Sequence, residues 1–144
     1  MATDQSFDIF ISYNHASAKA AVKELYEKLK AKYGEAISIW IDDEQWTRRP
    51  GLNKNELLME GLKRSKCILC CVTSDYSKSI DCQNELSYAL RVHKGPRAIL
   101  MLDRYDDLAN EGVKLQIINE TRLNFYNNKV AFDMNVTPNK RNQR

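Results

Sequence analysis

Three short apolar runs constrain the fold of this chain more than any other feature. They are FDIFISY (residues 7–13), CILCCVT (67–73) and RAILML (97–102). Apolar residues fill nearly every position of these runs instead of every second one, which is typical of strands covered on both faces. Segments with helical spacing of apolar residues follow the runs, so we expect a parallel sheet with right-handed crossovers.

Weaker patterns complete the set of elements. Short strands are predicted at residues 37–41 and 121–125. Four helices are predicted: 17–33, with Ser17 as a possible N-cap and Gly34 after the last turn; 53–64, with the capping spacing of Asn53 and Glu56; one that begins near Ser79; and 113–119. We therefore predict an α/β, flavodoxin-like three-layer fold, with a five-stranded parallel sheet in the order 2-1-3-4-5 and helices on both faces.

The length and charge of the chain limit its organisation and its partners. With 144 residues, 43% of them hydrophobic, the chain can form one ordinary domain. We expect this domain at residues 7–134, between an N-terminal extension (1–6) and a polar tail (135–144). The net charge of +3 is spread along the chain, which does not favour nucleic acid as a partner. No apolar run approaches the roughly 20 residues of a membrane span, so we expect a cytoplasmic protein without membrane contact.

The four cysteines include a Cys-x-x-Cys pair but do not favour a metal site. Cys67 and Cys70 lie three positions apart in a predicted strand and therefore point to opposite faces. We expect Cys67, Cys70, Cys71 and Cys82 to be reduced core thiols, and no residue is predicted to bind a metal.

The predicted strand order selects candidate site residues. In an open α/β sheet, ligands bind beyond the carboxyl ends of the strands where the winding reverses, here between the first and third strands. The first strand ends with Ser12 and Tyr13, followed by Asn14, and the third leads through residues 74–76 into the helix that carries Glu85. Glu85 lies on the edge of the apolar stripe of that helix, so its carboxylate either reaches water or lines a cleft.

These residues also carry a resemblance to a known family. FDIFISYNH resembles the first box of a Toll/interleukin-1 receptor (TIR) domain, and Ser79-x-x-Cys82-x-x-Glu85 is similar to a motif of its NAD-cleaving branch. The resemblance covers roughly residues 7–125. It implies a flavodoxin-like fold and either NAD⁺ cleavage or homotypic scaffolding in immune or cell-death signalling. The implied partners are NAD⁺ and other TIR domains, as a homo-oligomer when active.

The resemblance implies that Glu85 is the catalytic residue of an NAD⁺ glycohydrolase. Nicotinamide leaves a cationic pyridinium as a neutral molecule, so the reaction needs no general acid of the kind that most glycosidases use. One carboxylate can stabilise the cationic ribose and hold its hydroxyls. The expected products are nicotinamide with ADP-ribose or cyclic ADP-ribose. NAD⁺ is then the substrate, and no cofactor is implied.

Seven further residues are candidate substrate contacts, and several have a plainer interpretation. Ser79 also suits an N-cap, Cys82 a core position, and Tyr13 with Asn14 an ordinary strand end. Trp46 suits a partly buried anchor of the loop at residues 42–52. The candidates are Ser12, Tyr13, Asn14, Asp42, Trp46, Ser79 and Cys82.

The loop at residues 42–52 corresponds by position to the BB loop of the family, which closes the substrate site or meets a neighbouring domain. Arg48 and Arg49 could approach a pyrophosphate or remain solvated. The Pro50-Gly51 pair resembles that of receptor and adaptor TIR domains, and Asp81 stands where some enzymatic members have tryptophan. The alternative function is therefore a non-enzymatic adaptor that binds other TIR domains.

Overall fold

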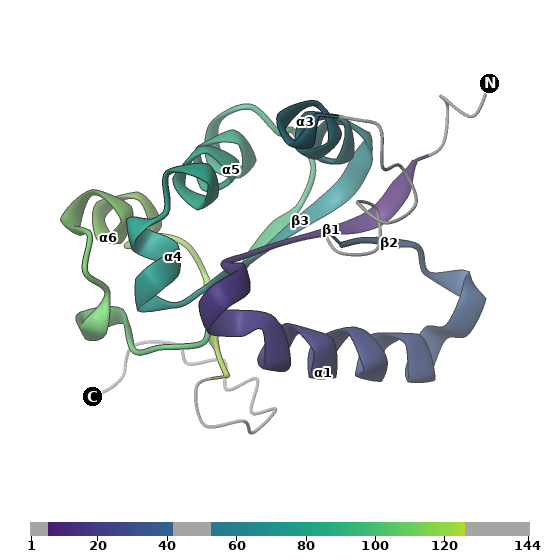
Figure 1. Ribbon diagram of the computed structural model, residues 1–144, viewed down its shortest axis with the longest axis horizontal. Helices are drawn as coiled ribbons and strands as arrows, with labels where there is room; N and C mark the ends of the chain where they lie inside the picture. Colours follow the sequence, from purple (N-terminus) through teal and green to yellow (C-terminus); the bar gives the residue numbers. More distant parts are fainter. Residues whose placement is uncertain (1–5, 42–52, 126–144) are drawn as a thin grey trace.

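A five-stranded parallel sheet forms the centre of the computed structural model, which describes residues 6–41 and 53–125. The strand order is β2-β1-β3-β4-β5, and every neighbouring pair is parallel (Figure 1). The strands are β1 (Phe7–Tyr13), β2 (Ile39–Trp40), β3 (Ser65–Val72), β4 (Arg97–Met101) and β5 (Arg122–Asn124). The structure confirms the predicted order, although β2 and β5 are shorter than the predicted strands.

Helices cover both faces of the sheet. Figure 1 shows α1 alone on one side, with α3, α4, α5 and α6 on the other. The helical segments are α1 (His15–Tyr33), η2 (Gly34–Ala36), α3 (Lys54–Arg64), α4 (Ser74–Lys78), α5 (Ile80–Arg91), η3 (Tyr105–Asp107) and α6 (Glu111–Ile117). No helix in these described ranges is both long and apolar enough to cross a bilayer.

The sheet separates two apolar cores. The core on the α1 side contains Val22 and Leu25 from the helix and Cys71 from β3. The core on the other side contains Cys70 of the same strand together with side chains from α3, α4, α5 and α6. Neighbouring strand residues point to opposite faces. All four cysteines are free thiols, but only Cys70, Cys71 and Cys82 are buried as predicted, whereas Cys67 is partly exposed.

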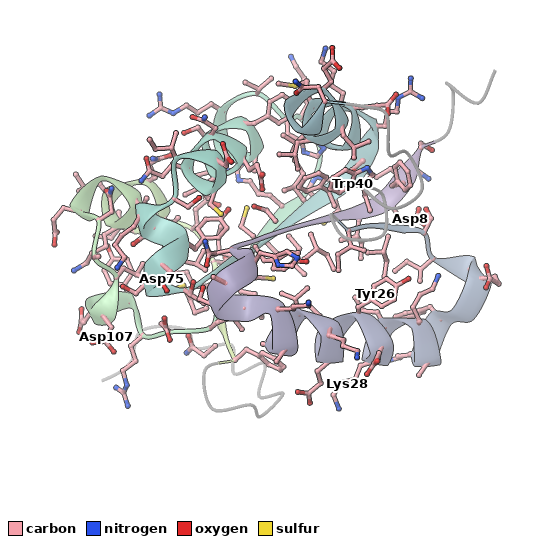
Figure 2. The ribbon with its side chains drawn as sticks, viewed as in Figure 1. Asp8, Tyr26, Lys28, Trp40, Asp75 and Asp107 are labelled. Atoms are coloured by element: carbon pink, nitrogen blue, oxygen red, sulfur yellow. The ribbon has the colours of Figure 1, made fainter. Side chains whose placement is uncertain are left out.

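The larger core includes a close contact between a helix and an aromatic pair. Trp40 lies beneath α3 (Figure 2) and stacks on Phe10, with ring centroids 4.6 Å apart. A Cβ atom at Gly61 of α3 would lie 2.5 Å from the Trp40 ring. Only glycine lets the helix approach the indole this closely.

Two predicted helix ends are confirmed and one is wrong. The Asn53 side chain accepts a hydrogen bond from the Glu56 N–H at 3.4 Å, and Gly34 ends α1 with φ of 56°. Ser17, however, is not the N-cap of α1. Asn14 caps the helix instead, because its Oδ1 atom accepts bonds from both the N–H and the hydroxyl of Ser17.

One helix was not predicted, and another begins earlier than predicted. The five-residue helix α4 lies where only the end of a strand was expected, and Thr73 caps it. The helix expected at 113–119 begins two residues earlier, because Asn110 accepts a bond from the Val113 N–H at 3.0 Å. The capping residues Thr73 and Asn110 are of types that occur both in helix caps and in turns. A local sequence pattern therefore does not distinguish a helix start from a turn at these positions.

Candidate active site

Glu85 lies on the buried face of α5 and not at its edge. Its side chain is 9% exposed, and Cys82, Leu86 and Ala89 of the same helix are also buried. A carboxylate with so little contact with water requires polar partners inside the protein.

The partners of Glu85 come from β1 and α4. The Ser12 hydroxyl donates a hydrogen bond to the Glu85 Oε1 atom at 2.6 Å, and the Tyr76 hydroxyl lies 2.8 Å from the Ser12 oxygen. Ser12 and Tyr76 are 1% and 0% exposed. A bond of 2.6 Å is in the range of hydroxyl–carboxylate pairs, in which the acceptor is charged.

The sheet register brings the elements of this site together. Ser12 pairs with Cys70 and Tyr13 with Cys71, so β1 and β3 end at the same edge of the sheet. At that edge β1 lies between β2 and β3, which is the point where the winding reverses. The predicted location of the site, between strands one and three, is where the carboxylate of Glu85 meets Ser12.

A second group of hydroxyls fixes the start of α4 and hence Tyr76. Thr73 Oγ1 accepts a bond from the Tyr76 N–H at 3.0 Å and lies 2.7 Å from the Ser17 hydroxyl oxygen of α1. The Asp103 carboxylate, which follows β4, accepts a bond from the Ser74 N–H at 2.7 Å. Side chains from three elements therefore set the position of α4 beside β1.

Burial determines the protonation of the groups around Glu85. Desolvation raises the pKa of the Tyr76 phenol well above its usual value, and raises the pKa of the Cys70 thiol to about 12. The negative charge of Glu85 contributes to both shifts as a smaller cause. Both groups therefore carry their protons at neutral pH.

The other predicted contacts have different surroundings. Tyr13 packs against the core on the α1 side, whereas Ser12 and Glu85 belong to the opposite side of the sheet. The Tyr13 ring also stacks on His15, with centroids 5.5 Å apart. Asn14 caps α1. The structure does not bring the Tyr13 ring to the carboxylate, and the roles of Tyr13 and Asn14 in substrate binding remain predictions.

Two residues of the Ser-x-x-Cys-x-x-Glu motif have structural roles. The Ser79 side chain caps α5 by accepting a bond from the Cys82 N–H at 3.2 Å. Cys82 is 4% exposed and packs in the larger core. These are the plainer interpretations of both residues, and they explain how the motif places Glu85 against β1.

Some predicted site residues cannot be placed. Asp42, Trp46, Arg48 and Arg49 lie outside the described residues. Within residues 6–41 and 53–125, no three His, Cys, Asp or Glu side chains gather into a potential metal site.

Tyr76 is the residue of this site to which the sequence analysis gave no role. It follows the third strand, in the segment TSDYSKS, and the switch-point rule places it near the site without indicating a partner for it. The spacing of Thr73 and Tyr76 suits a helix cap and its acceptor, which could have indicated a short helix there. Such a helix would have made Tyr76, an aromatic residue in a polar segment, a candidate member of the site.

Comparisons with known proteins identify the family. The family model described as TIR domain matches residues 9–133. No curated protein matches the chain. The crystal structure of the TIR domain of the Toll-related receptor TRR-2 from Hydra magnipapillata is similar, with a TM-score of 0.63 and 17% identity over 88% of this chain and 92% of that one.

A second solved structure has the same fold. The TIR domains of the activated Roq1 resistosome, which directly recognises the pathogen effector XopQ, align with a TM-score of 0.59 and 17% identity over 80% of this chain and 75% of that one. At this identity the two structures support the fold, and the family match covers most of the sequence. This protein therefore belongs to the TIR domain family.

Proposed function

We propose that this chain is an NAD⁺ glycohydrolase that cleaves the nicotinamide–ribose bond in immune or cell-death signalling. The observation that carries the proposal is the position of Glu85, a nearly buried carboxylate at the switch point of the sheet with a hydroxyl donor 2.6 Å from its Oε1 atom. The family match adds support, because the TIR family includes members that cleave NAD⁺.

The reaction requires little of the protein beyond a positioned negative charge. The bond between ribose C1′ and the nicotinamide nitrogen breaks, and its electron pair leaves with nicotinamide, which becomes neutral. The positive charge passes to the ribose, and water adds to C1′ and releases a proton to give ADP-ribose. Attack by an adenine nitrogen of the same molecule, in place of water, gives cyclic ADP-ribose.

Glu85 suits this transition state for electrostatic reasons. A charge in a site with little water interacts more strongly with a developing cation than it would in bulk solvent. A carboxylate offers about four acceptor positions, and the Ser12 hydroxyl uses one of them. Ribose hydroxyls are suitable donors to the same group, so Glu85 would both orient the sugar and stabilise its charge.

On the basis of the sequence alone, we assign the recognition of the nucleotide to Asp42 and Trp46. The chain leaves β2 at Ile41, at the same edge of the sheet as Ser12. A stacking tryptophan and a carboxylate are suited to the aromatic and hydroxyl groups of NAD⁺.

Self-association is the second part of the proposal. The Roq1 TIR domains belong to an activated resistosome, which supports an assembled active form for this chain too. If a neighbouring copy completes the site, specific activity should fall on dilution. Specific activity that is independent of concentration would contradict this part.

One observation favours the alternative function, a non-enzymatic adaptor that binds other TIR domains. The Pro50-Gly51 pair resembles that of receptor and adaptor TIR domains, and Glu85 would then make a purely structural contact. On this view, Glu85→Gln would leave partner binding intact, while Trp46→Ala would remove it.

The decisive experiment measures nicotinamide release from NAD⁺ by the native chain, clustered on beads, and by Glu85→Gln. We expect release by the native chain and a loss of about 10²- to 10³-fold in the variant, the size seen when one electrostatic contact to a transition state is removed. Glu24→Gln is the matched control, because Glu24 lies on α1 and pairs with Lys28 at 3.9 Å. If the native chain releases no nicotinamide, the adaptor becomes the better account.

A further inference from the structure

The proposed reaction gives no role to Tyr76, although its hydroxyl lies 2.8 Å from the Ser12 oxygen. The side chain is fully buried and comes from α4. Three hydrogen bonds fix the start of this helix: Thr73 Oγ1 accepts from the Tyr76 N–H and lies 2.7 Å from the Ser17 hydroxyl of α1, and the Ser74 N–H donates to the Asp103 carboxylate after β4. A phenol is more costly to bury than the phenyl ring of phenylalanine unless its hydroxyl has a partner.

The proton count determines the direction of these hydrogen bonds. A serine hydroxyl carries one proton, and Ser12 donates it to Glu85 Oε1 at 2.6 Å. Ser12 can then only accept from Tyr76, so the phenol is the donor of the 2.8 Å bond. Both hydroxyl protons point toward the carboxylate, and each bond polarises the next.

Within residues 6–41 and 53–125, titratable groups near Glu85 come from three elements. They are the Tyr76 phenol on α4, the Cys70 thiol on β3 and the Cys82 thiol on α5, one turn before Glu85 itself. Cys70 interacts with the Tyr76 hydroxyl. Burial keeps the phenol protonated, so Tyr76 remains a donor throughout the neutral pH range.

We infer that Ser12 and Tyr76 are positioning residues, which form a relay of hydroxyl donors that holds Glu85 in its charged form and fixes its Oε1 atom. The catalytic part of this inference rests on the proposed glycohydrolase activity. Neither residue needs to touch the substrate. Their contribution is to keep a nearly buried carboxylate ionised in an environment that disfavours charge.

The relay makes a prediction that a simple packing role does not. Hydrogen bonds to a carboxylate favour its ionised form, so the loss of a donor moves the titration of Glu85 to higher pH. Ser12→Ala should raise the titration midpoint by about one pH unit, and Tyr76→Phe by about half a unit, because the phenol acts only through Ser12. Tyr76→Phe also removes a single oxygen atom and retains the packing of the ring.

The experiment follows the ¹³C carboxyl resonance of Glu85 against pH, with the signal assigned by its absence in Glu85→Gln. The double variant tests the order of the relay, since Tyr76→Phe should cause no further shift once Ser12 is alanine. Ser65→Ala and Tyr105→Phe are matched controls. Their hydroxyls donate to the carbonyls of Gly61 and Lys114 at 2.7 and 2.8 Å, and their loss should leave the midpoint unchanged.

The same variants are assayed for nicotinamide release across pH, where the acid limb of kcat/KM should shift in parallel with the resonance. Equal midpoints in all variants, or shifts that simply add in the double variant, would overturn the relay even if the chain cleaves NAD⁺. Shifted midpoints without any nicotinamide release, native chain included, would overturn the proposed function and with it the catalytic part of the inference.

Discussion

The two edges of the sheet use polar side chains differently. At the edge where the strands begin, Asp8 accepts a bond from the Ser38 N–H, and the Ser65 hydroxyl donates to the Gly61 carbonyl. At the edge where the strands end, the chain of bonds from Tyr76 through Ser12 to Glu85 joins side chains only.

This difference separates stability from function. Buried backbone N–H and C=O groups must find partners in any fold, so the contacts at the first edge meet a requirement of the backbone. At the second edge Thr73 and Asp103 also accept bonds from backbone N–H groups. The bonds that join Tyr76, Ser12 and Glu85, however, satisfy no backbone group. Apolar residues of similar size could fill that space at lower cost, so stability alone does not account for the carboxylate, in agreement with the role that we propose for it.

The largest effect on stability is expected for Gly61→Ala, near the first edge. Alanine normally stabilises a helix by about 1 kcal/mol relative to glycine. Here the new Cβ atom would lie 2.5 Å from the Trp40 ring, which is buried and stacked on Phe10. We therefore expect a loss of about 2 kcal/mol in the free energy of unfolding, measured by urea denaturation.

Trp40→Phe supplies the control for this contact. The smaller ring leaves room for the Cβ atom, so the cost of Gly61→Ala should shrink in that background. An equal cost in both backgrounds would mean that the contact with Trp40 is not its cause.

The second prediction concerns the other edge and compares one substitution with three. Ser12→Ala removes one hydrogen-bond donor from a nearly buried carboxylate and should lower the free energy of unfolding by about 1 kcal/mol. The triple variant Ser12→Ala, Tyr76→Phe and Glu85→Met replaces the whole network with apolar groups. We expect it to be at least as stable as the native chain.

Urea denaturation of both variants checks this prediction. A triple variant less stable than Ser12→Ala alone would show that the network stabilises the fold, and the contrast between the two edges would then disappear. The nicotinamide assay on the triple variant should show no activity.

The smallest effect is expected at Asp8, which is partly exposed. Its pKa is lowered chiefly by the bond from the Ser38 N–H, and also by Lys66 at 3.5 Å. A lowered pKa in the folded state means that the stabilisation is present above the usual carboxyl pKa and is lost as the pH falls through the folded value. Asp8→Asn should therefore cost well under 1 kcal/mol at pH 7, since solvent screens the charge.

The measurement compares the thermal stability of the native chain and Asp8→Asn between pH 7 and pH 2. The gap between them should close in the acid range. If the difference in thermal stability between the two proteins is the same at every pH, the effect comes from the geometry of the amide and not from the charge of Asp8.

Much of the fold could be predicted because the sheet imposes a local pattern on each strand. Strands covered on both faces read as continuous apolar runs, and helical crossovers between them imply parallel pairing. The ends of the elements were less predictable. Asn14 and Ser17 are both suitable caps, and only the bond from the Ser17 N–H to Asn14 Oδ1 shows which of them caps α1.

The site was predictable in outline for the same reason. The switch-point rule places Ser12 and the helix of Glu85 together before any side chain is positioned. The same rule places residues 74–76 at this point too, but the bond between Tyr76 and Ser12 could not be predicted, because it depends on how the short helix α4 packs.

The sequence by itself determined the strand order and the family of the chain, and it brought Ser12 and the helix of Glu85 to one edge of the sheet, since these depend on patterns that the segments themselves carry. The tertiary structure decided the depth of Glu85 and the identity of its partners. Periodicity gives the angle of a side chain around a helix axis, whereas its burial and its hydrogen bonds depend on which residues of distant strands and helices pack against that face.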